Sequence, residues 1–62
     1  MRVFVYYDMD HGDMEVFPTL EEAKAHADEC WPDSIDEEWE ECGDSIHRSE
    51  YQSIHTKFVR FD

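Results

Sequence analysis

The chain has 62 residues with 5 basic and 17 acidic side chains, so its formal net charge is −12 with the 4 His counted neutral. This length fits one domain over residues 1–62 and excludes multidomain enzymes. The shortage of Lys and Arg argues against direct nucleic-acid binding, because phosphate contacts need cations. A mean hydropathy of −0.81, with no long apolar run, argues against a membrane span. The first residues lack a signal-peptide pattern, so we expect a cytoplasmic protein.

The composition predicts a folded chain despite its charge. Hydrophobic residues make up 40 % and aromatic residues 15 %, which is rich for a disordered segment. The two cysteines, Cys30 and Cys42, carry no C-x-x-C spacing and no secretion signal accompanies them. We therefore expect reduced thiols rather than a disulfide.

The N-terminal third predicts a β-hairpin. Residues 2–7 alternate with β-branched or aromatic side chains on both faces, which is typical of a central strand. Residues 8–13 contain Asp, His and Gly in a turn-like order, and residues 14–17 form a second strand that Pro18 ends.

A helix is predicted next, from Thr19 to the residue before Pro32. Thr19 and Glu22 have the spacing of a capping box, in which the hydroxyl accepts from a free backbone amide. Leu20, Ala23 and Ala27 recur at helical spacing, so we expect them to form the buried stripe.

The acidic segment, residues 33–44, allows two interpretations. Ser34 and Glu37 have capping-box spacing, and Gly43 would close a short helix. Alternatively, residues 38–42 begin a strand that turns at residues 43–44. Intrinsic propensity favours the helix.

Residues 45–61 predict two β-strands around a polar turn at residues 48–52. The element order is then β-β-α-(acidic segment)-β-β. We predict an α+β domain in which one helix packs on a small, mostly antiparallel sheet.

Neither a metal site nor an active site is predicted. An EF-hand calcium loop needs Gly at its sixth position and Glu at its twelfth. Counted from Asp8, Gly12 is the fifth residue and Thr19 the twelfth, so the Asp8–Asp13 loop does not fit this pattern. A set of Cys30, Cys42, His47 and His55 matches no zinc-finger spacing. Surrounding negative charge would raise a thiol pKa, which is the opposite of activation. We expect no cofactor, no metal and no enzymatic activity.

The acidic segment is the main functional lead. Its carboxylates, with a Trp as anchor, predict a surface that imitates nucleic acid and covers a basic groove on another protein. Two plainer explanations remain open: core Trp residues with acids that only aid solubility, or adaptation to a high-salt cytoplasm. The predicted partner-binding residues are Asp33, Asp36, Glu37, Glu38, Trp39, Glu40, Glu41 and Asp44.

The layout resembles small acidic inhibitor proteins encoded by bacteriophages, including anti-CRISPR proteins, DNA mimics and an inhibitor of host RNA polymerase. The last is similar in having a hairpin followed by a helix that starts like Leu20-Glu21-Glu22-Ala23. The likeness is one of size, charge and element order, and it carries over no functional residue. It implies a host protein with a basic nucleic-acid-binding surface as partner, in the host cytoplasm. The alternative is a small structural or housekeeping module, halophilic or homodimeric, without a heterologous target; a metal-binding domain is a third.

Overall fold

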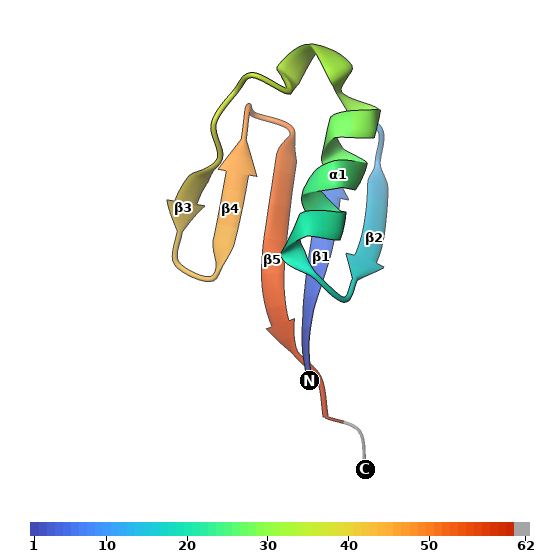
Figure 1. Ribbon diagram of the computed structural model, residues 1–62, viewed down its shortest axis with the longest axis vertical. Helices are drawn as coiled ribbons and strands as arrows, with labels where there is room; N and C mark the ends of the chain where they lie inside the picture. Colours follow the sequence, from blue (N-terminus) through green and yellow to red (C-terminus); the bar gives the residue numbers. More distant parts are fainter. Residues whose placement is uncertain (61–62) are drawn as a thin grey trace.

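The computed structural model describes residues 1–60 and contains one helix and a five-stranded sheet (Figure 1). The strands lie in the order β2-β1-β5-β4-β3, and every neighbouring pair is antiparallel. The α+β prediction is therefore confirmed. The elements are β1 (Arg2–Asp8), β2 (Asp13–Phe17), α1 (Leu20–Cys30), the 3-10 turn η1 (Pro32–Ser34), β3 (Glu40–Cys42), β4 (Ser45–Arg48) and β5 (Gln52–Phe58).

The first strand is central, as its two apolar faces predicted. β1 pairs with β2 on one side and with β5 on the other, and Phe4 lies opposite Phe17 and Thr56. Phe4 and Tyr6 point toward the helix, where they join the core with Ala23, Ala27 and Ile54. The intervening Val5 is buried by its neighbours on the uncovered face of the sheet.

The Thr19 half of the predicted capping box is confirmed, whereas the Glu22 carboxylate bonds the Thr19 hydroxyl in place of a free backbone amide. The Thr19 hydroxyl accepts from the Glu22 backbone N–H at 3.2 Å and donates to the Glu22 carboxylate at 3.2 Å. The last turn closes when the Trp31 backbone N–H donates to the Ala27 carbonyl, and Pro32 follows. Acidic residues in the first turn favour the positive end of the helix dipole.

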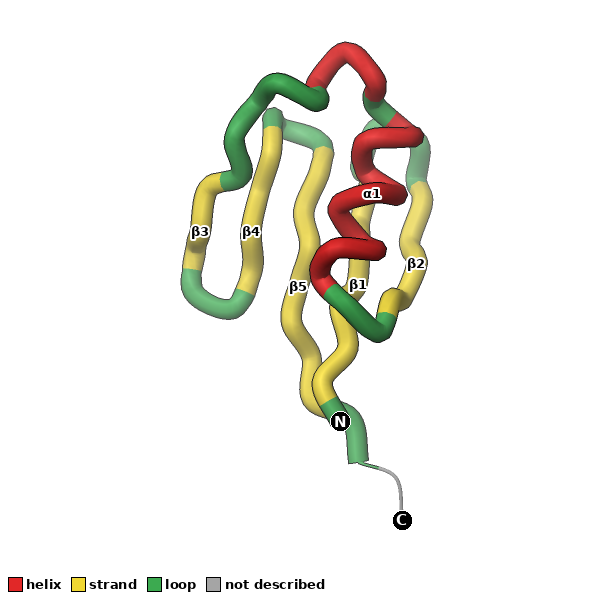
Figure 2. Tube along the Cα trace, viewed as in Figure 1, coloured by secondary structure: helices red, strands yellow, loops and turns green. Residues whose placement is uncertain are grey.

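The helix covers only part of the sheet. Its backbone packs on β1, β2 and β5, whereas the β3–β4 hairpin stands farther from it (Figure 2) and is joined to it through side chains, including the ion pair between Arg48 of β4 and Asp28 of α1. Trp39 and Ile46 reach back to the core from this hairpin and the loop before it. The hairpin therefore forms a wing that is fastened at few points.

The helix favoured for the acidic segment is wrong, and the strand interpretation is right. After η1 the chain is irregular and then extended through β3, and it turns at Gly43, whose φ is +63°. A helix would place like charges three and four residues apart, where they repel. Pairing with β4 instead satisfies one edge of the strand backbone and lets Trp39 reach the core.

The C-terminal β structure is confirmed through Phe58, where β5 ends. Phe61, which the alternation placed in the same strand, lies outside the described residues. Arg48, predicted in a polar turn, is instead the last residue of β4 and is only 2 % exposed. Its burial proves important for the surface above it.

Candidate protein-binding surface

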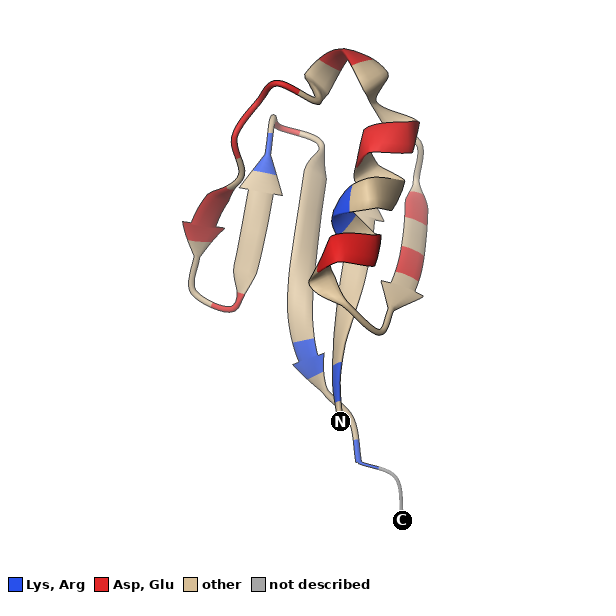
Figure 3. Ribbon diagram, in the orientation of Figure 1, with Lys and Arg blue, Asp and Glu red and all other residues tan. Residues whose placement is uncertain are grey.

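The acidic side chains of the segment gather on one edge of the molecule. We call this set the acidic ridge: Asp33, Asp36, Glu37, Glu38, Glu40, Glu41 and Asp44. All of them are exposed. The ridge begins at η1, follows the loop into β3, and ends at the β3–β4 turn (Figure 3). It is a continuous stretch of chain rather than scattered surface charge.

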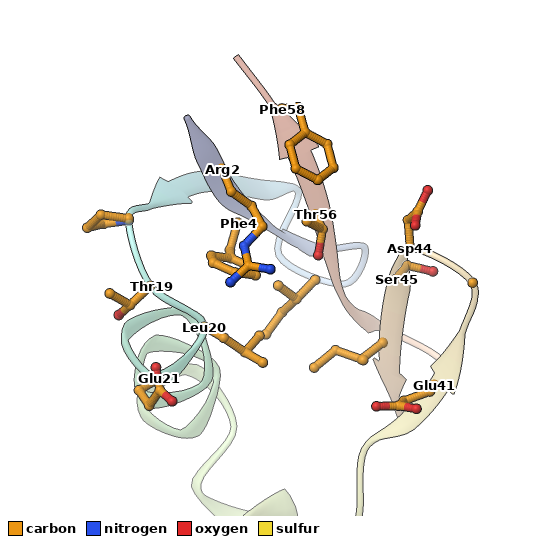
Figure 4. A pocket seen from close by; sticks show the side chains of 14 residues that line it. Arg2, Phe4, Thr19, Leu20, Glu21, Glu41, Asp44, Ser45, Thr56 and Phe58 are labelled. Carbon is orange, nitrogen blue, oxygen red and sulfur yellow. The ribbon is translucent and has the colours of Figure 1, made fainter. Parts of the chain in front are cut away.

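No basic side chain neutralises the acidic ridge. Within residues 1–60, no ion pair involves any of its carboxylates. Arg48, the basic residue closest to it in sequence, is paired with Asp28 of the helix at 2.6 Å. Arg2 lies across the groove from Glu41 and Asp44 (Figure 4) and forms an ion pair with neither. The ridge therefore presents a negative field, without ion pairs, from η1 to the β3–β4 turn.

Trp39, the predicted anchor, packs inward in part. Its ring is partly buried against the core, and the Arg48 guanidinium lies 4.6 Å from the ring centroid. This cation–π contact is largely withdrawn from water, where such contacts are strongest. Trp39 therefore fastens the ridge to the core, and only its outer part is available to a partner.

A buried polar network holds Arg48 beneath the ridge. Its Nε donates to the side-chain amide oxygen of Gln52 (Oε1) at 2.8 Å and its Nη1 to the Asp28 carboxylate at 2.6 Å. Gln52 in turn donates to the Tyr6 hydroxyl and to the Ala27 carbonyl. The network joins β4, β5, β1 and α1. Through the Arg48–Asp28 ion pair it fastens the β3–β4 hairpin to the helix.

A second polar centre, Asp8, lies at the same end of the sheet, opposite Gln52, and the Tyr6 hydroxyl links the two. The carboxylate is 2 % exposed and accepts from the Trp31 indole at 2.7 Å, the His11 ring at 2.8 Å and the Tyr6 hydroxyl at 3.0 Å. The backbone N–H groups of Asp10 and His11 also donate to it. Burial alone would raise the pKa of Asp8, but these hydrogen bonds outweigh it and lower the pKa to about 2.

A groove of mixed polarity, with Arg2 among its lining residues, runs between the start of α1 and the β3–β4 hairpin (Figure 4). Its floor includes Ile46 and Ile54, and Leu20 faces them from the helix. Glu41 and Asp44, both members of the acidic ridge, lie on the hairpin side. The groove therefore joins an apolar floor to a carboxylate rim.

The metal sites considered from sequence are not assembled. The Asp8 oxygens face N–H and O–H donors, so the Asp8–Asp13 loop cannot offer them to calcium. His47 and His55 lie on the uncovered face of the sheet with ring centroids 6.0 Å apart, whereas Cys30 contacts His26 on the helix side.

A different group does assemble at the β2 edge. Among residues 1–60, one set of three potential metal ligands lies within 4.8 Å, namely Asp13, His26 and Cys30. Two spacings in the sequence indicate this group. Asp13 and Glu15 are two apart on a strand and so share a face, and His26 and Cys30 are four apart on the next helix and so share a face as well. Only the packing of α1 on β2 brings the two pairs together.

Comparison with protein-family models, curated proteins and solved structures finds no match to this chain. In the described residues, no helix is long and apolar enough to cross a membrane.

Proposed function

We propose that this protein is a non-enzymatic inhibitor, of the kind encoded by bacteriophages, that covers a basic nucleic-acid-binding surface on a host protein. The carrying observation is the acidic ridge, whose exposed carboxylates have no ion-pair partner in the described chain. Like charges held side by side destabilise a small domain. A basic partner would relieve that repulsion, so the free energy that the carboxylates cost in folding would favour association.

The backbone of the ridge suits an imitation of nucleic acid. An extended chain separates residues two apart by about 6.7 Å, similar to successive phosphates along one strand; Glu38 and Glu40 have this sequence spacing at the start of β3, whereas Glu41 points to the other face of the sheet. A net charge of −12 would also steer a basic partner into fast, salt-sensitive association.

The groove adds a means of discrimination. A partner Arg or Lys would lay its aliphatic stem on Ile46 and Ile54 and place its charged head against Glu41 or Asp44. Arg fits best, because its planar guanidinium binds a carboxylate through two hydrogen bonds. Charge thus attracts the partner, and the groove selects the side chain.

Two charge-matched variants test this proposal. The ridge variant carries Glu38→Gln, Glu40→Gln and Glu41→Gln; the control carries Asp10→Asn, Glu29→Gln and Glu50→Gln, all exposed residues elsewhere. Each loses three negative charges. Immobilised proteins are used to capture partners from host lysate, with duplex DNA as competitor. We expect the wild type and the control to retain a nucleic-acid enzyme that DNA displaces, and the ridge variant to lose it. Equal retention by both variants would refute the role of the ridge.

The alternative, a structural module that forms a homodimer, has one observation in its favour. The sheet face opposite the helix exposes Met14 and Val16, which are 61 % and 58 % exposed. A second copy would cover them. Sedimentation equilibrium with Val16→Lys decides it: a wild-type dimer that the variant dissociates supports the alternative, and a wild-type monomer at all concentrations removes it.

A further inference from the structure

Three side chains converge on one ring nitrogen at the β2 edge. His26 Nε2 lies 3.3 Å from an Asp13 carboxylate oxygen, 3.1 Å from a Glu15 carboxylate oxygen and 3.5 Å from the Cys30 sulfur. Asp13 and Glu15 come from β2, and His26 and Cys30 from α1. We call these four residues the β2–α1 cluster.

The separations match the edges of a tetrahedral zinc site. With Zn–N and Zn–O bonds of about 2.0–2.2 Å and Zn–S of about 2.3 Å, ligand atoms in a tetrahedron lie about 3.3–3.6 Å apart. The distances from His26 Nε2 to Asp13 and to Cys30 fall in this range, and that to Glu15 is slightly shorter. The nitrogen thus stands where one corner of such a site would stand.

A hydrogen bond donated by His26 Nε2 explains these three contacts less well than a bound cation does. Nε2 carries at most one hydrogen, which cannot point at both carboxylates and at the Cys30 sulfur together. A cation between Asp13, His26 and Cys30 would contact all three, because their ligand atoms lie within 4.8 Å of one another. The ring is also held in place, because it packs edge-on against Tyr6 and lies beside Phe17.

We propose that the β2–α1 cluster binds one Zn²⁺ through Asp13, His26 and Cys30, whose ligand atoms lie within 4.8 Å of one another, while Glu15 lies against His26 alone. The mixture of thiolate sulfur, imidazole nitrogen and carboxylate oxygen is the donor set that zinc accepts. With neutral His26, one carboxylate and a thiolate, the bound site has no net charge. The inference departs from the sequence-based expectation of no metal.

The thiol of Cys30 needs the cation in order to ionise. Burial raises its pKa, and the negative charges of Asp13, Asp8 and Glu15 raise it further. The free thiol therefore keeps its proton at neutral pH. A divalent cation reverses the local field and displaces that proton into solvent, so binding releases one proton from Cys30.

The cluster and the acidic ridge lie on opposite edges of the sheet, since β2 and β3 are its two outer strands. Zinc binding can therefore be tested independently of the proposed inhibitor function, and either proposal can fail without the other. The ion would join α1 to β2 without altering the β3–β4 hairpin.

Cobalt(II) is the direct probe, because a tetrahedral cobalt–thiolate site absorbs in the visible and shows charge-transfer bands in the near ultraviolet. Titration of the intact, reduced protein should saturate at one Co²⁺ per chain, and Zn²⁺ should displace it. We expect Cys30→Ser to abolish the charge-transfer bands and His26→Gln to weaken binding at least about tenfold. Cys42→Ser, the matched control on an exposed cysteine, should leave both unchanged.

A second charge-matched pair separates the site from general acidity. Asp13→Asn with Glu15→Gln should weaken binding by about the same factor as His26→Gln, whereas Glu40→Gln with Glu41→Gln should not. Octahedral spectra without charge transfer, or equal weakening by both pairs, would show loose binding to acidic groups and overturn the proposal.

Alkylation of the wild type avoids any variant that fails to fold. Zinc should slow the reaction of Cys30 with iodoacetamide at least about tenfold and leave that of the exposed Cys42 unchanged, as read by peptide mass spectrometry. Unchanged Cys30 reactivity at saturating zinc would overturn the assignment of this thiol as a ligand.

Discussion

Replacing Asp8 with Asn should remove the strongest single polar contribution to folding. The Asp8 carboxylate is 2 % exposed and collects donors from two side-chain rings, a phenol and two backbone amides. An Asn keeps one acceptor oxygen but turns an NH₂ group toward groups that themselves donate. We expect Asp8→Asn to lower the free energy of unfolding by about 3 kcal/mol at pH 7, in the range for hydrogen bonds to a buried charge.

The pH dependence gives the same magnitude by another route. Lowering the pKa of Asp8 from 3.8 to about 2 corresponds to roughly 2–3 kcal/mol. Because the folded-state pKa is depressed, this stabilisation is complete above about pH 4 and is lost as the pH falls toward 2. Acid also relieves repulsion among the other carboxylates, but it does so in both proteins. The difference between wild type and Asp8→Asn should therefore shrink by roughly 2–3 kcal/mol between pH 5 and pH 2.

Urea unfolding followed by tryptophan fluorescence measures both quantities, since Trp31 donates directly to Asp8. Asp10→Asn is the control: its side chain is 51 % exposed, and we expect a change within about 0.5 kcal/mol. A loss below about 1 kcal/mol for Asp8→Asn, or a difference that does not vary with pH, would refute this account of the network.

Three further changes test the local structure by urea unfolding. Thr19→Ala should cost about 1 kcal/mol, because it removes the acceptor for a free helix amide; no loss would mean that water replaces the cap. Gly43→Ala should cost about 1–2 kcal/mol from backbone strain alone, since φ is +63° and no atom crowds the position; neutrality would contradict the turn. Trp39→Ala should cost about 2–3 kcal/mol through lost packing and the uncovered Arg48, and an unchanged stability would place the ring outside the core.

The elements that local sequence patterns predict correctly are those whose energetics are local. The helix cap at Thr19, the alternation of β1 and the breaks at Pro18 and Pro32 act within a few residues, so each could be read directly. The acidic segment was misjudged because propensity ranks Glu as a helix former, whereas strand pairing and mutual repulsion decide its structure here.

The buried polar groups could not be predicted from the sequence for a different reason. Asp8, Arg48 and Gln52 are ordinary surface or turn residues by type, and each is buried only because its partners arrive from elsewhere in the chain. Arg48 meets Asp28 across 20 residues, and Gln52 meets Tyr6 across 46. Sequence showed the charge of the acidic ridge in full, but not the network that positions it.

That network bears on whether the ridge is functional or merely solubilising. Solubility requires net charge anywhere on the surface, and dispersed carboxylates supply it with less mutual repulsion. Here the charges follow one sheet edge, and a buried cation and a tryptophan hold the strand that carries them. Neutralising ridge residues should therefore raise the stability of the free protein while it weakens partner binding. A gain in folding stability together with a loss of partner affinity is characteristic of a surface that serves binding. If the carboxylates served only folding or solubility, neutralising them would not lower the affinity for a partner.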